Sequence, residues 1–206
     1  GGSRKDQYEN IIDTIIQIGQ AADVIRAICQ VIKSLVVDQL HIVGDIFDRG
    51  PRADIVMDSL MSSRNVDIQW GNHDVLWMGA ASGSRTLVAT VLANSIHYNN
   101  LEVIETGYGI SLRPLSIFAN EVYKNSDTNQ FKVKLTGTDA DQYTEKDKLL
   151  SARMYKAITI ILFKLEGQKV LRRPEFGMAD RLLLDKINYT DKTITLADKV
   201  YPMLDC

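Results

Sequence analysis

The sequence lacks the features of disulfide-rich, secreted and membrane-spanning proteins. It has two cysteines, Cys29 within a helical pattern and Cys206 at the end, which suggests free thiols in a reducing cytosol. Its longest apolar run, residues 157–163, is far shorter than the roughly 18 residues of a membrane span. No secretory signal pattern opens the printed sequence, and residues 1–3 resemble a tag remnant. These absences favour a cytoplasmic protein.

The sequence also lacks an excess of charge of either sign. Its 24 lysines and arginines nearly balance 26 aspartates and glutamates, giving a net charge of -2. This balance gives no reason to expect binding to nucleic acid or to a membrane surface. With 45% hydrophobic and 24% charged residues, the composition is ordinary for a globular protein. A chain of 206 residues suffices for one domain, with room for an extension.

Against this ordinary background, two polar motifs stand at the ends of short apolar runs. Gly-Asp-Ile-Phe-Asp-Arg-Gly at 44–50 follows the run 40–43, and Gly-Asn-His-Asp at 71–74 follows 66–70. Between the motifs, apolar residues recur at helical spacing after Pro51, which suits a first helical turn. Two strands joined by a helix of this length should be parallel with a right-handed crossover. Both motifs then lie at the carboxyl ends of adjacent strands, where open α/β sheets bind ligands.

The side chains of the two motifs suit phosphate-ester hydrolysis on a pair of divalent metals. Two such cations roughly 3.5–4 Å apart can acidify water and neutralise the phosphate together. We assign Asp45 as the carboxylate that bridges the metals and Asn72 as a neutral amide ligand to one of them. We expect both side chains to face one crevice.

Three further residues of the motifs fit the remaining tasks of the reaction. His73 can protonate the leaving alkoxide, and the Asp48 carboxylate can hold its other ring nitrogen. The planar guanidinium of Arg49 matches phosphate oxygens. The predicted catalytic residues are therefore His73 and Asp48, with Arg49 as the phosphate-binding residue.

In order and spacing, the two motifs resemble motifs two and three of the calcineurin-like metallophosphoesterases. A narrower resemblance, to bacterial class III fructose-1,6-bisphosphatases, covers nearly the whole chain from about Asp6. Its longest segments are HIVGDIFDRGP, VDIQWGNHDVLWMGAASGS, NNLEVIETGYGISLRPL, LLSARMYKAITIILFKLEGQ and RRPEFGMADRLLLDKINY. The resemblance implies hydrolysis of the 1-phosphate of fructose 1,6-bisphosphate in gluconeogenesis. The motifs by themselves imply only phosphoester hydrolysis.

The sequence also departs from the metallophosphoesterase pattern. The family uses an Asp-x-His motif on an earlier strand and two later histidines, whereas the only histidine after His73 is His97. The family's chains are also several times longer. We therefore expect an internal piece of the enzyme, with an incomplete site for a metal pair. Mixed oxygen and nitrogen ligands suit manganese, iron, zinc or magnesium, and manganese is our first choice. The remaining segments of the parent chain, or a second copy in a homo-oligomer, would be its partners.

Two alternatives to this function remain. The parent could be another metallophosphoesterase, such as a protein serine/threonine phosphatase, whose GDxxDRG and GNHE motifs are close relatives. Alternatively, this chain could be a non-catalytic folded module, as the missing metal ligands suggest. A substrate panel on the full-length protein distinguishes the first alternative from a fructose-1,6-bisphosphatase. Measuring metal content and turnover of this chain distinguishes the second alternative from an enzyme.

The patterns predict an α/β fold: part of a metallophosphoesterase α/β sandwich with a parallel βαβ core. An N-terminal helical hairpin is expected at 4–37, the core segment at 38–100, and a helical extension ending in a β-hairpin at 101–206. A helix should run from about 75 to 98, with a possible break at 82–84. Thr144 with Asp147 predicts the start of a further helix. The hairpin should turn at 190–192.

Several residues near the motifs have simpler structural interpretations. Asp74 is expected to be a helix N-cap rather than a metal ligand. His41 lies in a strand and should be packed or hydrogen-bonded, and His97 should cap a helix or lie on the surface. Trp70 and Trp77 are expected to be packing residues. None of these interpretations requires a role in catalysis.

Overall fold

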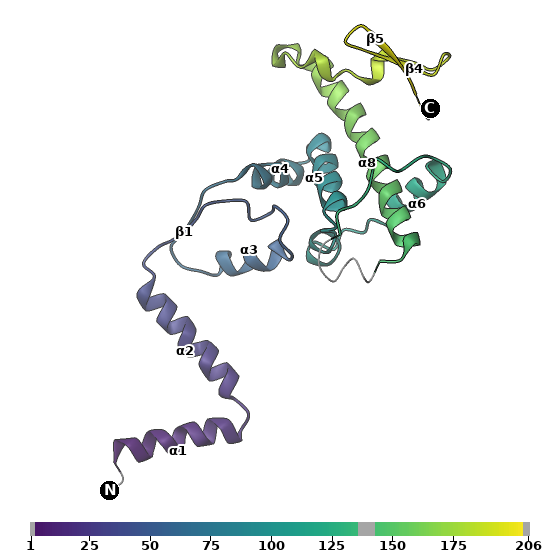
Figure 1. Ribbon diagram of the computed structural model, residues 1–206. Helices are drawn as coiled ribbons and strands as arrows, with labels where there is room; N and C mark the ends of the chain where they lie inside the picture. The colour runs from purple at the N-terminus through teal and green to yellow at the C-terminus, as the bar shows by residue number, and fades with distance from the viewer. Residues whose placement is uncertain (1–2, 136–142, 204–206) are drawn as a thin grey trace. The chain divides into compact units, whose positions relative to one another are not determined.

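The computed structural model describes residues 3–135 and 143–203 of the chain (Figure 1). The described residues divide into two units. One unit comprises the residues up to Ile42 together with 59–69, and the other comprises 43–58 together with the residues from Trp70 onward. Both sequence motifs belong to the second unit. Gly1, Gly2 and Cys206 lie outside the described residues, whereas Cys29 is an exposed free cysteine.

The first unit begins with two amphipathic helices, α1 (Arg4–Gln17) and α2 (Ala21–Val36). Ser3, grouped above with a tag remnant, is the N-cap of α1 and forms a capping box with Asp6. The chain turns sharply between the helices at Gly19, whose φ of 71° favours glycine (Figure 1). No described residue of either helix is buried. The amphipathic pattern of the two helices also predicts that they pack beside the first strand, and this stays a prediction.

A parallel strand pair completes the first unit. β1 (Leu40–Ile42) pairs with β2 (Val66–Ile68), with Leu40 opposite Val66 and Ile42 opposite Ile68. The connection contains α3 (Ala53–Met61), so the predicted order of strand, helix and parallel strand is confirmed. Between the apolar pairs, His41 Nδ1 lies 2.8 Å from Asp67 Oδ2. His41 is therefore hydrogen-bonded, as predicted.

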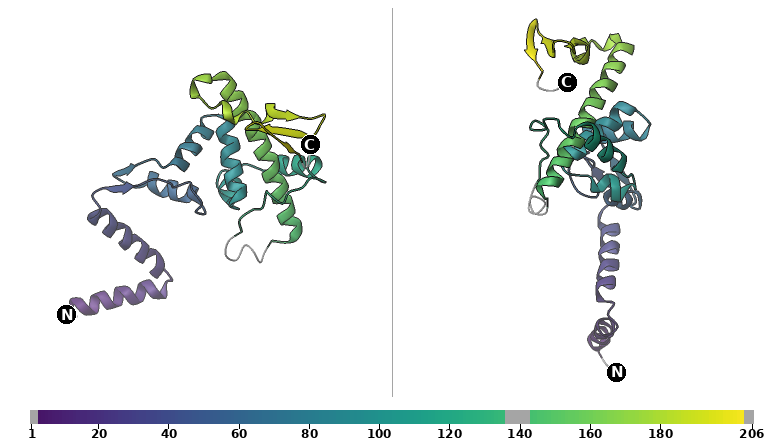
Figure 2. Two further views of the ribbon diagram at one scale, coloured as in Figure 1. Left: turned by 45° about the horizontal axis from the view of Figure 1, so that its top comes forward. Right: turned by 90° about the vertical axis from the view of Figure 1, so that its right-hand side faces the viewer.

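Four helices dominate the second unit: α4 (Asn72–Ala81), α5 (Arg85–His97), α6 (Arg113–Val122) and α8 (Glu145–Arg172). The expected break at 82–84 separates α4 from α5, with Gly83 at a φ of 88°. Thr144 and Asp147 form the predicted capping box at the start of α8. Helix α8 packs against α5 and α6, and α5 packs against α4 (Figures 1 and 2).

The core of the second unit lies where these helices meet. Small residues allow close approach: Ala119 of α6 and Ala157 of α8 are both 0% exposed. Around them pack larger apolar side chains, including Ile96 and Ile158. Burying one such side chain stabilises a fold by about 1.5–3 kcal/mol. Helix α5 is thus firmly held, and the residues at its C-terminal end are held with it.

The C-terminal part combines short helical turns and an antiparallel sheet. The sequence after Pro174 predicts a short helix near 178–184, but the structure has two 3₁₀ turns there, η3 (Ala179–Arg181) and η4 (Leu184–Lys186), which contact α8. The predicted hairpin is confirmed by the pairing of β3 (Ile187–Asn188) with β4 (Thr193–Leu196). A third strand, β5 (Lys199–Pro202), pairs with β4 and was not predicted.

The described residues therefore form a mixed α/β structure with one parallel and one antiparallel sheet. Within these residues, no helix is long and apolar enough to cross a membrane. The polar, turn-rich sequence at 124–143 predicts a loop, and its residues 136–142 lie outside the described residues.

Candidate active site

The loop that carries the first motif begins in an unusual backbone conformation. Gly44 has a φ of 95° and Asp45 a φ of 55°, both in the left-handed region. Asp tolerates this region better than most residues, yet such a conformation still costs on the order of 1 kcal/mol or more. The surrounding structure must therefore supply contacts that hold Asp45 in place.

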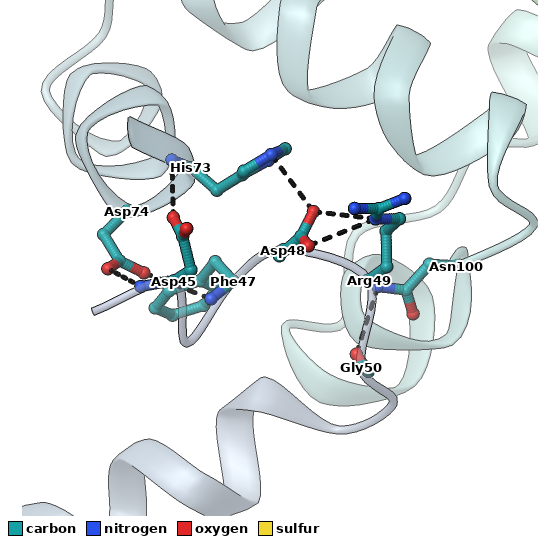
Figure 3. Close-up of polar contacts among 8 residues, drawn as sticks. All are labelled: Asp45, Phe47, Asp48, Arg49, Gly50, His73, Asp74 and Asn100. Atoms are coloured by element: carbon teal, nitrogen blue, oxygen red, sulfur yellow. Dashed lines mark hydrogen bonds and ion pairs between the residues drawn. The ribbon is translucent and has the colours of Figure 1, made fainter. Parts of the chain in front are cut away.

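Those contacts come from the carboxylate of Asp74, in the first turn of α4 (Figure 3). One of its oxygens accepts the backbone N–H groups of Asp45 (2.6 Å) and Gly71 (2.9 Å), and the other accepts that of Phe47 (3.1 Å). Asp74 is only 6% exposed. The expected N-cap role is thus corrected: Gly71 is the N-cap, and Asp74 is the third helical residue. Its carboxylate caps the helix and also joins the two motifs.

In a second hydrogen bond between the motifs, the donor belongs to the second motif and the acceptor to the first. The backbone N–H of His73 donates to Asp45 Oδ1 at 3.2 Å (Figure 3). The close approach also restricts position 71, because a Cβ on Gly71 would lie 2.1 Å from Asp45 Oδ1. A glycine is therefore required here by space, although its φ of -85° suits any residue.

Asp48 connects the imidazole of His73 to the guanidinium of Arg49. His73 Nε2 lies 3.0 Å from Asp48 Oδ1, and Arg49 Nε donates to both carboxylate oxygens at 3.0 and 3.1 Å. The His73 and Asp48 side chains are 23% and 27% exposed, so solvent reaches both. The structure brings these three predicted residues together, with His73 Nδ1 as the ring nitrogen not directed at Asp48. Their catalytic roles stay predictions.

The far end of the loop is held by residues that follow α5. Asn100 Nδ2 donates to the carbonyl of Gly50 at 3.2 Å (Figure 3). The Arg49 guanidinium carbon lies 4.9 Å from the centroid of the Tyr98 ring. Such a cation–π contact contributes about 0.5–1 kcal/mol at an exposed site. Neither residue was singled out from the sequence, because both lie far along the chain and carry no motif of their own.

Past Gly50, an ion pair fixes the entry into α3. Arg52, at a φ of 56°, donates from Nη2 to Asp54 Oδ2 at 2.7 Å and lies 3.8 Å from Glu102 through Nη1. Hydrogen bonds from Arg52 hold the pKa of Asp54 below its usual value. A Cβ on Gly107 would lie 2.7 Å from the Asp54 carboxyl carbon, so η1 (Val103–Gly107) passes close to this pair.

An aromatic stack supports the loop from the side of α4. The Phe47 ring stacks on Trp77 at 4.8 Å, and Trp77 lies 5.8 Å from the Tyr108 ring. The expected packing role of Trp77 is therefore confirmed, whereas Trp70 is 64% exposed. Burial raises the pKa of Tyr108, as do the nearby Asp54 and Asp58 carboxylates.

The residues present do not by themselves fit a metal pair. Asp45 and Asn72 are both exposed, and the Asn72 side chain makes no hydrogen bond to a described residue. Nowhere in 3–135 or 143–203 do three His, Cys, Asp or Glu side chains lie where they could hold one metal ion. Two oxygen ligands are too few for two closely spaced cations.

His97, the remaining histidine, closes α5 as predicted and is partly exposed. Its ring packs 4.7 Å from that of Tyr98 and 5.0 Å from that of Tyr155 on α8. Its Nδ1 is buried without a hydrogen-bond partner among the described residues. Burial, and then the charge of Lys134, lowers the pKa of His97.

The family profile and the individual relatives that match this chain point to the same family of proteins. The profile of the Firmicute fructose-1,6-bisphosphatase family matches residues 2–206. Proteins named fructose-1,6-bisphosphatase class 3 from Alkaliphilus metalliredigens, Clostridium acetobutylicum and Clostridioides difficile are 53%, 52% and 50% identical. The matches cover 98%, 100% and 98% of this chain but only 30% of each relative. No solved structure matches the chain.

Proposed function

Because the chain belongs to the Firmicute fructose-1,6-bisphosphatase family, we propose that the full-length protein hydrolyses fructose 1,6-bisphosphate to fructose 6-phosphate. This chain spans about 30% of the length of the relatives compared, so the activity is proposed for the whole protein. The relatives' names support the substrate, and the site supports the type of reaction. The observation that carries the proposal is the contact of Asp48 with both His73 and Arg49, in the same loop as Asp45.

In the proposed reaction, each side chain of this group has one task. Arg49 uses Nε to bind Asp48, which leaves its two terminal nitrogens to bind phosphate oxygens. Asp48 orients the His73 ring through Nε2, so that Nδ1 protonates the leaving sugar oxygen. The fixed fork of Arg49 and the oriented ring of His73 position the phosphate and its leaving group together.

We further propose that Asp45 and Asn72 are the ligands that this chain contributes to a metal pair, with manganese as first choice. The other ligands would come from the rest of the parent protein. The parallel pair β1–β2 would then belong to a larger metallophosphoesterase sandwich in the full-length protein. A role in gluconeogenesis and a cytoplasmic location complete the proposal.

The test is a substrate panel with purified full-length protein and Mn²⁺. We expect phosphate release from fructose 1,6-bisphosphate to exceed release from a phosphoserine peptide and from p-nitrophenyl phosphate. The Asp45→Asn variant should lose the metal-dependent turnover, because a carboxylate proposed to bridge the metals is replaced by an amide. Preference for the phosphopeptide would instead support a protein phosphatase and overturn the proposed substrate.

A further inference from the structure

A second cation lies on the same aromatic ring as Arg49. The Arg49 guanidinium carbon and the Lys134 ammonium nitrogen are each 4.9 Å from the centroid of the Tyr98 ring. The two positive groups are therefore separated by at most twice this distance. Tyr98 attracts both, because the face of an aromatic ring is negative.

The backbone holds Lys134 at this position. Its N–H donates to the carbonyl of His97 at 2.7 Å, and His97 directly precedes Tyr98 at the end of α5. Helix α5 is packed in the core, so this hydrogen bond ties residue 134 to the rigid part of the unit. Lys134 is an exposed residue, so a ligand in solvent can reach it.

The charges around Tyr98 are not balanced. Arg49 is paired with Asp48, which also contacts His73, whereas Lys134 makes no ion pair with a described residue. Positive groups at this separation repel each other, even if weakly in water. An anion with negative groups at both ends would be attracted to both cations at once.

We propose that Lys134 binds the second phosphate of a sugar bisphosphate whose scissile phosphate is bound by Arg49. This inference rests on the proposed function, and it adds a residue that determines specificity. The spacing allowed by one shared ring suits a ligand with phosphates at both ends of a short carbon chain. A monophosphate ester, such as a phosphoserine side chain, occupies only one of the two positions.

The test compares two substrates in the full-length protein. For Lys134→Gln, we expect kcat/KM on fructose 1,6-bisphosphate to fall roughly 10- to 100-fold, the loss typical of one hydrogen bond to a charged group. The change should appear mainly as a higher KM. On fructose 1-phosphate, which lacks the second phosphate, kcat/KM should be unchanged. Lys134→Arg should restore most of the activity on the bisphosphate.

Lys132→Gln is the matched control, because Lys132 is also exposed and lies two residues away. It should leave both substrates unaffected. Equal losses on both substrates for Lys134→Gln, or no loss on either, would show that Lys134 does not bind the second phosphate. Neither result would affect the proposed function. The wild-type protein is assayed first. If it does not hydrolyse fructose 1,6-bisphosphate, the proposed function is overturned, whatever the role of Lys134.

Discussion

The buried carboxylate of Asp74 accepts the backbone N–H of Asp45 at 2.6 Å, so one motif holds the other in its left-handed conformation. The same carboxylate also accepts the N–H of Gly71 and so caps α4. Helix capping and loop geometry therefore depend on one side chain. A change at Asp74 should act on stability and on the site together.

Asp74→Asn is expected to destabilise the full-length protein by about 1–3 kcal/mol, because an amide nitrogen would face backbone donors where an oxygen accepted them. Hydrogen exchange at 45–47 should become faster. Urea unfolding and exchange mass spectrometry measure the two effects. Asp147→Asn is the control, because Asp147 forms a capping box at the start of α8 but is exposed. It should leave exchange at 45–47 unchanged, and equal effects of the two changes would contradict the role given to Asp74.

Gly71→Ala should reduce stability and activity, because its Cβ would overlap the Asp45 carboxylate. Overpacking of this kind costs about 1–3 kcal/mol, and the shift of Asp45 should lower kcat as well. Gly50→Ala in the same region is the control, since its Cβ would meet nothing within 4 Å. Unfolding midpoints and kcat of the full-length variants check the prediction. If Gly71→Ala behaves like Gly50→Ala, the close approach at Gly71 is not a constraint on the protein.

His73→Ala in the full-length enzyme should lower kcat by roughly 10²–10⁴-fold, the usual contribution of a general acid, and leave metal content intact. Asp48→Asn should also lower kcat. The double variant should be hardly worse than His73→Ala, because residues that act as a unit are not additive. Steady-state kinetics measure this cycle. His41→Ala is the control, because it removes a His–Asp pair on β1 and β2 and should leave kcat unchanged. If the loss of kcat in the double variant equals the product of the two single losses, Asp48 and His73 do not act as a unit.

Stability should depend on pH through His97. Its pKa is lowered in the folded state, so the unfolded chain binds a proton first as the pH falls. Stability is therefore complete above the ordinary histidine pKa of about 6.5 and declines from there down to the lowered folded-state pKa. Urea unfolding midpoints between about pH 5 and pH 7.5 should show this slope. The slope should be smaller in His97→Gln, which cannot titrate, and an identical slope would exclude His97 as its source.

The chain of residues 1–206 alone should release no phosphate from fructose 1,6-bisphosphate with added Mn²⁺. The described residues offer no three-ligand cluster for a metal, and the chain is about 30% of its relatives' length. A phosphate-release assay on the purified chain measures this, with the full-length protein as positive control. Turnover proportional to the concentration of the purified chain would show that it carries a complete site.

Local patterns in the sequence predicted the elements that local forces determine. The apolar runs gave the parallel pair β1–β2, and the pair Thr144 and Asp147 gave the start of α8. The contact of Asp48 with His73 also follows from the spacing of the motifs, because a strand, helix and strand bring their ends together.

Other features depend on contacts that local patterns do not show. Asp74 looked like an N-cap because the helix was expected to begin at Val75, whereas it begins at Asn72. The ring contact of His97 was not predicted because its partner, Tyr155, lies far along the chain on α8. Strand β5 was missed because Ala197 and Asp198 both have positive φ at its turn, a conformation for which alanine gives no signal.

The order of residues in the loop and its supports has a consequence for biosynthesis. The segment 44–50 leaves the ribosome before Asp74, Tyr98 and Asn100, the residues that hold it. Chains emerge N-terminus first, at roughly 5–20 residues per second. A nascent chain arrested just after Asp74 would thus carry both motifs but no support for the end of the loop at Gly50. The site can reach its final geometry only after α5 and Asn100 have been synthesised.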